Sequence, residues 1–296
     1  MGTHITKYKI FGGKMNLIKK IIPDKLYIQM MFFYHFRKFC DFNNPKSLNE
    51  KIQWLKINDR NPTYIELVDK VKVKNYVKNK IGEKYIIPTY QTWTSADEID
   101  LSKLPDSFVM KCNHDSHCVF ICDDKNSFDI KKAKKVLGER LKYNAYWYGR
   151  EWPYKNVKPQ ILVEKKLSSD NNGELYDYKI LCFNGNPQNI MVCAGRNIGK
   201  LRYYYFDLEW NFLKYQPEDF YVDKDEKFLY LKPKRLNEMI NIARKLSKDI
   251  PLVRVDFYET KEQIWFGELT FYPCAGFDTD ITKEADILMG KRLNIN

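Results

Sequence analysis

The chain has 296 residues, of which 44% are hydrophobic and 30% are charged, and its formal net charge is +12. This is the composition of a soluble globular protein with a substantial core and room for one large domain or two ordinary ones. The positive surplus favours an anionic partner, such as a nucleotide, an acidic sugar, an anionic lipid or a nucleic acid, although lysine runs on solvated helix faces need no partner.

The cysteines and the N-terminal residues indicate the cellular compartment in which we expect the protein. Seven scattered cysteines argue against a disulfide scaffold and favour a reducing cytoplasm. The longest apolar stretch, residues 26–36, is too short to span a bilayer and fits a buried or interfacial helix. Residues 1–14 lack the apolar core of a secretory signal, and we expect a flexible extension, in which Gly2 and Thr6 have the spacing of a myristoylation pattern. We expect a cytoplasmic protein and keep open its peripheral association with the inner face of the membrane.

Hydrophobic periodicity divides the chain into helical and extended segments. Ser47 and Glu50 form a capping-box pattern before an amphipathic run, and Asn184 with Gly185 is typical of a tight turn between strands. The predicted helices lie within residues 15–60, 64–81, 129–143 and 236–246. The predicted strands are 86–93, 107–112, 118–122, 160–167, 176–185, 189–195, 202–210, 253–258 and 264–272. This pattern indicates an α+β fold with mostly antiparallel sheets.

Two carboxylates stand among apolar residues in the last pair of predicted strands. Asp256 shares a strand face with Arg254, and by the same alternation Glu268 shares a face with Phe266 and Thr270. A hairpin of this length would bring Asp256 and Glu268 near each other, where they would repel unless a cation lay between them. Magnesium prefers such oxygen ligands, usually with substrate phosphates completing its shell. The alternatives are that both carboxylates face solvent or pair with Arg254.

Further charged residues suit a nucleotide. Lys70 lies in an early helical stretch, and Lys111 ends a strand before a polar turn. Glu164 ends an apolar strand, and Lys179 lies in the strand pair after it. Together these residues supply cations for a polyphosphate, carboxylates for its metal and a strand edge that could pair with a base, and the backbone N–H groups of the turn would help to hold phosphate.

The stretch KCNHDSHCVFIC, residues 111–122, raises the question of a zinc site. Its candidate ligands are Cys112, His114, His117, Cys118 and Cys122. Their spacing fits no standard pattern of paired ligands, and strand alternation would scatter the last two cysteines along one returning strand. We therefore assign the importance of this stretch to Lys111 and to the turn after it.

Eight blocks spread over most of the chain resemble one known family. They are SLNEKIQWLK (47–56), LVDK (67–70), SFVMKCNH (107–114), REWPYKN (150–156), VEKKL (163–167), DYKILCFNG (177–185), VRVDFY (253–258) and FGELTFYP (266–273). In this order they resemble the TupA-like ATP-grasp family, which occurs in gene clusters for teichuronopeptide and capsular polysaccharide synthesis. One block alone would be a weak signal, but the ordered set over residues 17–280 is specific.

The resemblance implies an ATP-grasp fold, in which two α+β lobes hold ATP. It divides the chain into a flexible extension (1–14), a helical N-terminal region leading into the first lobe (15–106), a first lobe (107–167) and a second lobe with the metal-binding hairpin (168–296). The implied activity is ATP-dependent ligation of a carboxylate to an amine through an acyl phosphate, with ATP and Mg²⁺ as cofactors. The implied substrates are an amino acid or amine and a uronic-acid-containing surface glycan or its precursor.

The resemblance also implies a role for individual residues. Lys70 and Lys111 would contact the phosphates, with the 112–118 turn closing over them. Glu164 and the backbone from Lys165 to Leu167 would meet the adenine, and Asp177 would bind the ribose. Asp256 and Glu268 would bind the metal, while Lys179 and Arg254 would face the transferred phosphoryl group. Mg²⁺, Lys and Arg would neutralise charge that builds on the phosphoryl oxygens.

The sequence departs from the family pattern at two places. Related proteins have a glycine-rich turn where this chain reads His114-Asp115-Ser116-His117-Cys118, and Asp115 adds a negative charge where phosphate should bind. Weaker ATP affinity or a differently shaped turn would follow. Thr270 stands where many ATP-grasp enzymes outside this family have Asn, but a hydroxyl can still meet Mg²⁺.

Two other functions remain as alternatives. A glycosyltransferase is suggested by two DxD patterns, Asp278 to Asp280 and Asp223 to Asp225, although such a motif normally ends a strand of a nucleotide-binding lobe. A nucleic-acid-binding protein is suggested by the charge and by the aromatic run 202–206. Those aromatics are better explained as sheet packing, and no nucleic-acid-binding motif is present.

Overall fold

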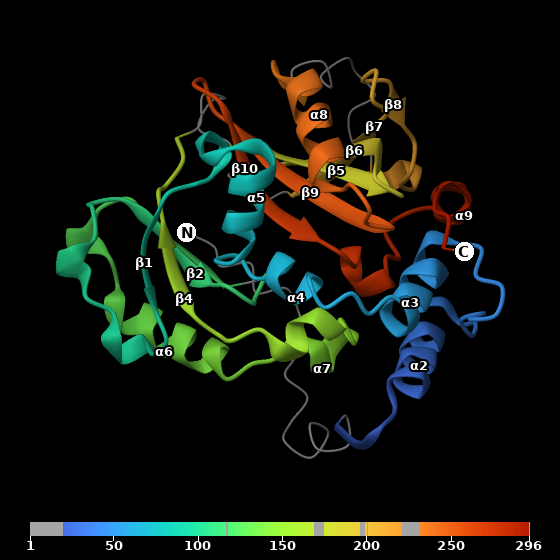
Figure 1. Ribbon diagram of the computed structural model, residues 1–296, viewed down its shortest axis with the longest axis horizontal. Helices are drawn as coiled ribbons and strands as arrows, with labels where there is room; N and C mark the ends of the chain where they lie inside the picture. The colour runs from blue at the N-terminus through green and yellow to red at the C-terminus, as the bar shows by residue number, and fades with distance from the viewer. Residues whose placement is uncertain are drawn as a thin grey trace. The chain divides into compact units, whose positions relative to one another are not determined.

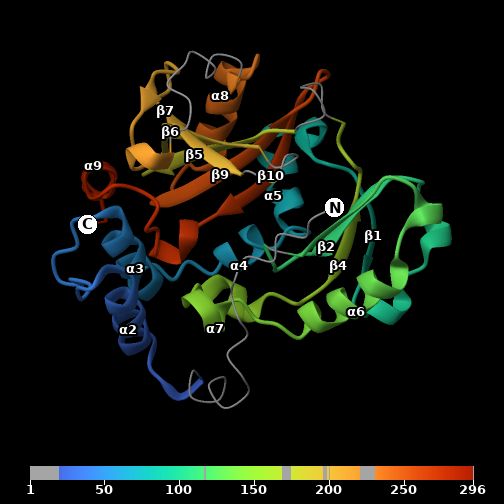
Figure 2. The same ribbon diagram turned by 180° about the vertical axis from the view of Figure 1, so that it is seen from behind.

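The computed structural model describes residues 20–116, 118–168, 175–195, 199, 201–220 and 231–295. Their contacts form two compact units (Figures 1 and 2), which we call unit 1 (residues 62–168) and unit 2 (residues 20–61 together with the described residues after 168). Each unit combines helices with one antiparallel sheet. The predicted α+β class with antiparallel sheets is therefore confirmed.

The division of the N-terminal region differs from the expected one. Residues 15–106 were expected to lead as one helical region into the first lobe, but the described residues before 62 belong to unit 2. The physical reason is the packing of α3 (Leu48–Asn58) against α9 (Lys283–Arg292), near the other end of the chain. Residues 62–106 remain with unit 1, and their β1 (Thr89–Trp93) joins its sheet.

Unit 1 is built on a four-stranded sheet in the order β1-β4-β2-β3. The other strands are β2 (Phe108–Cys112), β3 (Val119–Cys122) and β4 (Ile161–Glu164). Its helices are α4 (Tyr64–Leu67), α5 (Val73–Ile81), α6 (Ile130–Leu141) and α7 (Tyr146–Gly149). α5 ends at Gly82, whose φ of 100° lies in the region that favours glycine, as the sequence predicted.

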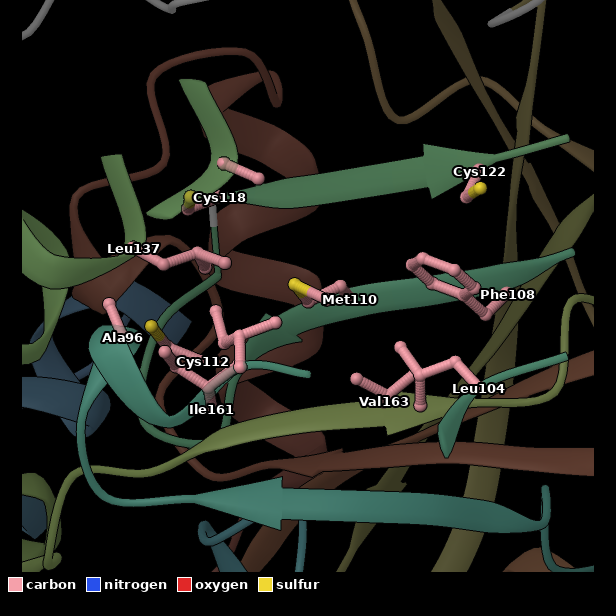
Figure 3. Packing of buried hydrophobic residues seen from close by; sticks show 12 residues of the cluster. Ala96, Leu104, Phe108, Met110, Cys112, Cys118, Cys122, Leu137, Ile161 and Val163 are labelled. Carbon is pink, nitrogen blue, oxygen red and sulfur yellow. The ribbon is translucent and has the colours of Figure 1, made fainter. Parts of the chain in front are cut away.

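The core of unit 1 lies between one face of the sheet and α6. Figure 3 shows Phe108, Met110 and Cys112 of β2 pointing to the same side as Ile161 and Val163 of β4. Alternation along the strands sends the intervening residues to the opposite face, which carries the charged side chains described below.

Unit 2 is built on a six-stranded sheet in the order β10-β9-β5-β6-β7-β8. The strands are β5 (Asp177–Phe183), β6 (Asn186–Ala194), β7 (Arg202–Phe206), β8 (Phe212–Leu213), β9 (Leu252–Glu259) and β10 (Ile264–Thr270). The helices are α2 (Asp24–Phe36), α3, α8 (Leu236–Leu246) and α9. The predicted capping box of Ser47 and Glu50 starts α3, and the predicted turn at Asn184 and Gly185 joins β5 to β6 with positive φ at both residues.

The two faces of the unit 2 sheet differ in chemistry. α8 packs on β5, β6 and β9 (Figure 1). Val253, Val255 and Phe257 of β9 are buried on one face, as alternation predicted. Arg254, Asp256 and their cross-strand neighbours lie on the other face. No helix among the described residues is long and apolar enough to cross a membrane.

Candidate active site

A buried carboxylate joins two lysines in unit 1. One oxygen of Glu164 lies 2.5 Å from Nζ of Lys74, and the other lies 2.5 Å from Nζ of Lys111. Glu164 ends β4, Lys111 lies in β2 and Lys74 lies in α5. Lys74 also donates hydrogen bonds to the carbonyl of Ile87 and the hydroxyl of Thr89. The carboxylate is thus held by a helix and by the sheet that it belongs to.

The register of the sheet explains this arrangement. Lys111 lies opposite Leu162, and Glu164 lies opposite Val109, so all four side chains share the face that is turned away from α6. On the same face, Val119 lies opposite Lys111 and is 50% exposed. A lysine with an exposed apolar neighbour at a sheet face suits a ligand that has both phosphates and a ring system.

Charge and burial oppose each other in this cluster. Burial raises the pKa of Glu164, but the two ammonium groups outweigh it, so the pKa of this carboxyl lies below its ordinary value. Burial lowers the pKa of Lys74, and Glu164 only partly offsets the effect. One carboxylate charge facing two ammonium groups leaves the cluster with a positive surplus.

The turn after β2 is fixed by an ion pair that sequence reasoning missed. Asp115 accepts two hydrogen bonds from the guanidinium of Arg140 in α6, at 2.5 and 2.6 Å. Lys70 donates to the carbonyl of Asp115 at 3.1 Å, and its backbone N–H donates to the carbonyl of Asn113. The negative charge that was expected to repel phosphate is therefore neutralised by a bidentate partner.

The thiols of residues 111–122 are core residues. Cys112, Cys118 and Cys122 are all buried in the core of unit 1 (Figure 3). Burial raises the pKa of Cys112 to about 12 and that of Cys118 to about 11, so both stay protonated. The three thiols therefore contribute to the packing of the unit 1 core.

The described histidine of this stretch, His114, has a partner at each ring nitrogen. The ring nitrogens of His114 are engaged by the side-chain oxygen of Asn113 and the carbonyl of Tyr143. His117 lies outside the described residues. Across the described part of the chain, no three His, Cys, Asp or Glu side chains form a group that could hold a metal by themselves.

Unit 2 contains a second buried carboxylate, on the face of the sheet opposite α8. Asp256 of β9 accepts hydrogen bonds from Nε and Nη2 of Arg254 at 2.7 and 2.8 Å, and it pairs with Lys179 of β5. Lys179 lies directly opposite Asp256 in the sheet. Burial alone would lower the pKa of both bases, but Asp256 outweighs it, so the pKa of Lys179 and that of Arg254 lie above their ordinary values.

Glu268 lies beside Asp256, as we predicted from the length of the hairpin. The two residues face each other across β9 and β10, and Glu268 accepts a hydrogen bond from the hydroxyl of Thr270 at 3.2 Å. Nη2 of Arg254 lies 3.7 Å from Glu268 and 3.1 Å from the Thr270 hydroxyl. Two carboxylates and a hydroxyl therefore gather around one guanidinium.

The expectation that Phe266 and Glu268 share a face is wrong. A β-bulge falls between them, so that Phe266 lies opposite Phe257 while Glu268 lies opposite Asp256. Gly267 stands at the bulge, where an added Cβ would lie 3.1 Å from the Asp256 carbonyl oxygen. The bulge turns the apolar residue to the core and keeps the carboxylate with its partner.

Asp177 extends this cluster along β5. It lies opposite Tyr258, and one of its oxygens is 3.9 Å from Nζ of Lys179. The charge of Asp177, together with burial, raises the pKa of the Tyr258 hydroxyl well above its ordinary value. Asp177, Asp256 and Glu268 against Lys179 and Arg254 leave this cluster with a negative surplus.

Magnesium fits the donors of this second cluster by their chemistry. Asp256, Glu268 and Thr270 offer hard oxygen atoms, and Mg²⁺ is usually bound by one or two carboxylates with substrate phosphates and water completing its shell.

The remaining predicted residues are also located. Lys165 and Leu167 follow β4, and the backbone N–H of Lys165 donates to the carbonyl of Pro88. Of the two DxD patterns, residues 223–225 lie outside the described residues. Asp278 does not end a strand: it accepts from the backbone N–H of Asp280 and lies in the segment before α9.

Lys74, Arg140 and Tyr258 are the site residues that sequence reasoning missed. Lys74 borders the apolar stripe of α5, which is the signal that could have found it. Arg140 had no such signal, because its partner lies 25 residues earlier across a strand and a helix.

Comparisons with known proteins were made for the whole chain. The family model described as TupA-like ATPgrasp matches residues 50–294. No curated protein sequence matches the chain significantly.

Solved structures similar to this chain are two ligases and a synthetase by their titles. D-alanine–D-alanine ligase from Bacillus anthracis has a TM-score of 0.43 at 14% identity, covering 76% of this chain and 66% of that protein. The ADP complex of N5-carboxyaminoimidazole ribonucleotide synthetase has a TM-score of 0.43 at 12% identity, and the match covers 75% of this chain and 50% of that protein. D-alanine–D-alanine ligase from Helicobacter pylori has a TM-score of 0.38 at 13% identity, and the match covers 83% of this chain and 69% of that protein. The matched part of this chain spans between half and about two-thirds of the length of these proteins.

Proposed function

Because this chain belongs to the TupA-like ATP-grasp family, we propose that it is an ATP-dependent ligase that joins a carboxylate to an amine through an acyl phosphate. The observation that carries the proposal is the pairing of Asp256 with Glu268 across β9 and β10. Two adjacent carboxylates on one sheet face, beside buried cations, suit the metal and phosphate chemistry of phosphoryl transfer.

Unit 1 supplies the nucleotide contacts in this proposal. Lys111 and Lys70 contact the phosphates, as the family motifs suggest, and Lys74 joins them because it shares Glu164 with Lys111. Glu164 and the backbone of residues 165–167 meet the adenine. The positive surplus around Glu164 supports a polyanionic ligand.

Unit 2 supplies the groups that act on the transferred phosphoryl group. Asp256 and Glu268, with the Thr270 hydroxyl, would hold Mg²⁺, which supplies charge neutralisation on the phosphoryl oxygens when it is bound. Lys179 and Arg254 stay cationic because Asp256 raises their pKa values, and they add positive charge at the same sheet face. Asp177 binds the ribose.

The proposed reaction balances in two steps. A substrate carboxylate oxygen attacks the γ-phosphorus of ATP, the bond to the β-phosphate oxygen breaks and ADP leaves. The amine nitrogen then attacks the acyl carbon, the bond from that carbon to the phosphate oxygen breaks, and inorganic phosphate leaves while the amine gives up a proton. Neither step needs a nucleophilic side chain, so binding and charge stabilisation carry the catalysis.

The substrate class is the finer part of the proposal. We assign the carboxylate to a uronic-acid-containing surface glycan or its precursor, and the amine to an amino acid or a simple amine. The gene neighbourhoods of similar proteins support the glycan, and the net charge of +12 supports an anionic acceptor.

The test is ADP and phosphate release from Mg-ATP over a panel of uronic acids, sugar nucleotides and amino acids, with products read by mass spectrometry. We expect one acceptor and one amine to give a product heavier by the amine minus water. Glu268→Gln and Lys111→Ala should lose this product by at least about 100-fold, because the first removes the charge of a proposed metal ligand and the second removes a proposed phosphate contact.

The matched control for Glu268→Gln is Glu262→Gln, since Glu262 is exposed in the turn between β9 and β10. This control should keep full turnover. A gain of glycosyl mass from a sugar nucleotide without ATP consumption would overturn the ligase proposal. Full turnover by Glu268→Gln would remove that residue from the proposed site.

A further inference from the structure

Helix α2 presents an apolar face to solvent. Leu26, Met30, Phe33 and Tyr34 are exposed by 43% to 65%, and their spacing places them on one side of the helix. The same sequence stretch was expected to form a buried or interfacial helix. Isolated exposed apolar residues are ordinary, but four on one helix face indicate a contact surface.

The exposed face is held in a fixed position by the rest of unit 2. Ile28 and Phe32 on the opposite side of α2 are fully buried. The Gln29 side chain donates to the carbonyl of Cys40 and accepts from its backbone N–H, both at 2.8 Å. This pair of hydrogen bonds places Phe39 beside the helix, where its ring stacks on that of Phe33 at 5.1 Å.

Positive charge surrounds this face. Lys20, Lys25 and Arg37 are exposed, and the guanidinium of Arg37 lies 5.9 Å above the ring of Tyr34. In sequence, residues 1–40 contain eight Lys or Arg and one acidic residue, Asp24. A segment of about one-seventh of the chain thus carries more than half of its net charge.

We propose that α2, with Phe39 and the basic residues around it, is a docking surface for an anionic lipid bilayer. Aromatic and aliphatic side chains on one helix face, next to lysine and arginine, suit a helix that lies in the interface of an anionic membrane. Self-association is disfavoured, because a second copy would bring two strongly basic segments together. This inference goes beyond the proposed ligase activity and does not depend on it.

The test is co-sedimentation of the full chain with vesicles of phosphatidylcholine alone and with vesicles that contain about one-third phosphatidylglycerol. We expect binding to the anionic vesicles and at least about tenfold weaker binding to the neutral ones, since each nearby basic residue adds to the attraction. Raising the salt concentration should weaken the binding to anionic vesicles.

Two variants separate the apolar and the charged contributions. Phe33→Ser with Phe39→Ser should weaken binding by at least about tenfold, because two partly exposed aromatic side chains no longer enter the interface. Lys25→Gln with Arg37→Gln should weaken binding to a similar degree at low salt only. The matched control is Phe220→Ser, because Phe220 is 43% exposed, as is Phe33, but lies outside α2.

The outcomes distinguish the possible occupants of this face. All variants at these exposed residues should keep the thermal unfolding midpoint of the parent. A loss of vesicle binding can then be attributed to the changed surface and not to unfolding. Equal binding to both vesicle types, or equal weakening by Phe220→Ser, would overturn the proposal. So would a concentration-dependent dimer that Phe33→Ser with Phe39→Ser converts to a monomer without any effect of lipid.

Discussion

Units 1 and 2 each bury a carboxylate between two basic side chains, but the clusters differ in their surplus charge. Glu164 in unit 1 pairs with Lys74 and Lys111, and these three groups together carry one positive charge in excess. Asp256 in unit 2 faces Lys179 and Arg254, but Asp177 and Glu268 stand beside it and leave one negative charge in excess. The sign of the surplus agrees with the ligands that we propose, which are phosphate for the first cluster and a metal cation for the second.

The clusters also differ in how they are built. In unit 2 the charged residues are neighbours across β5, β9 and β10, so the sheet register alone brings them together. In unit 1 one of the two lysines comes from α5, so the cluster also depends on how a helix packs on the sheet. Strand alternation predicted that the unit 2 carboxylates lie near each other, although it missed the register shift at the bulge, whereas no sequence pattern predicted how α5 packs on the unit 1 sheet.

Asp256→Asn should have the largest effect, because it removes the charge that balances two buried bases. Breaking a buried ion pair from one side destabilises a protein by about 3–5 kcal/mol. Asp256 accepts two hydrogen bonds from Arg254 and also pairs with Lys179, so we expect a loss in this range. The measurement is the free energy of unfolding in urea, with Glu262→Gln as a control that should stay within about 0.5 kcal/mol of the parent.

A second substitution tests the reason for this loss. Adding Lys179→Met to Asp256→Asn removes one unbalanced buried charge and should recover part of the stability. If the double variant is less stable than Asp256→Asn by the full effect of Lys179→Met alone, the two residues do not interact. The charge balance around Asp256 would then not explain the difference between the unit 1 and unit 2 clusters.

Glu164→Gln should have a smaller effect in unit 1, about 2–3 kcal/mol at pH 7, because it weakens two charge-assisted hydrogen bonds. The pKa of Glu164 lies below its ordinary value, so its contribution to stability is present above about pH 4.5 and is lost as pH falls through the lowered pKa. The difference in unfolding free energy between the parent and Glu164→Gln should therefore shrink below that pH. A difference that is constant from pH 7 to pH 3 would contradict the ion-pair assignment.

Much of the fold follows from sequence pattern. The capping box at Ser47 and Glu50, the stop at Gly82 and the turn at Asn184 are local signals, and each is confirmed because the chemistry that produces it lies within a few residues. The membership of α3 in unit 2 has no local signal. It depends on contacts with α9, more than 200 residues later in the chain.

The family resemblance was predicted from ordered blocks of sequence and is confirmed by the family match. The expected proximity of Asp256 and Glu268 is also confirmed, but their direct pairing depends on a bulge that shifts the register between Phe266 and Glu268. The bulge at Gly267 and the neutralisation of Asp115 by Arg140 were not predicted. A glycine inside a strand is a signal for a bulge, whereas a partner on a distant helix leaves no such signal in the sequence.

Gly267→Ala tests how far the unit 2 cluster depends on the bulge. The added Cβ would lie 3.1 Å from the Asp256 carbonyl oxygen and 3.3 Å from the ring of Tyr258, so these atoms must move by a few tenths of an ångström. We expect a loss of about 1–3 kcal/mol in unfolding free energy, as for other overpacked positions. Gly138→Ala is the control, because a Cβ there would have ordinary contacts only, the nearest at 3.4 Å, and α6 favours alanine. Equal stability of the two variants would mean that the bulge adapts freely.

Lys74→Met should have the smallest of these effects. It tests whether the cluster of Glu164, Lys74 and Lys111 binds phosphate. Lys74 is 16% exposed and bound to Glu164, whereas Lys72 is 51% exposed and lies 3.9 Å from Glu66. If the surplus charge around Glu164 attracts phosphate, Lys74→Met should weaken ATP binding in calorimetric titration by about tenfold, or roughly 1.4 kcal/mol. Lys72→Met should leave the affinity unchanged, because its charge is screened by solvent. Equal affinities for the two variants would restrict the phosphate contacts to Lys111 and Lys70, and Lys74 would then serve only to hold Glu164 in place.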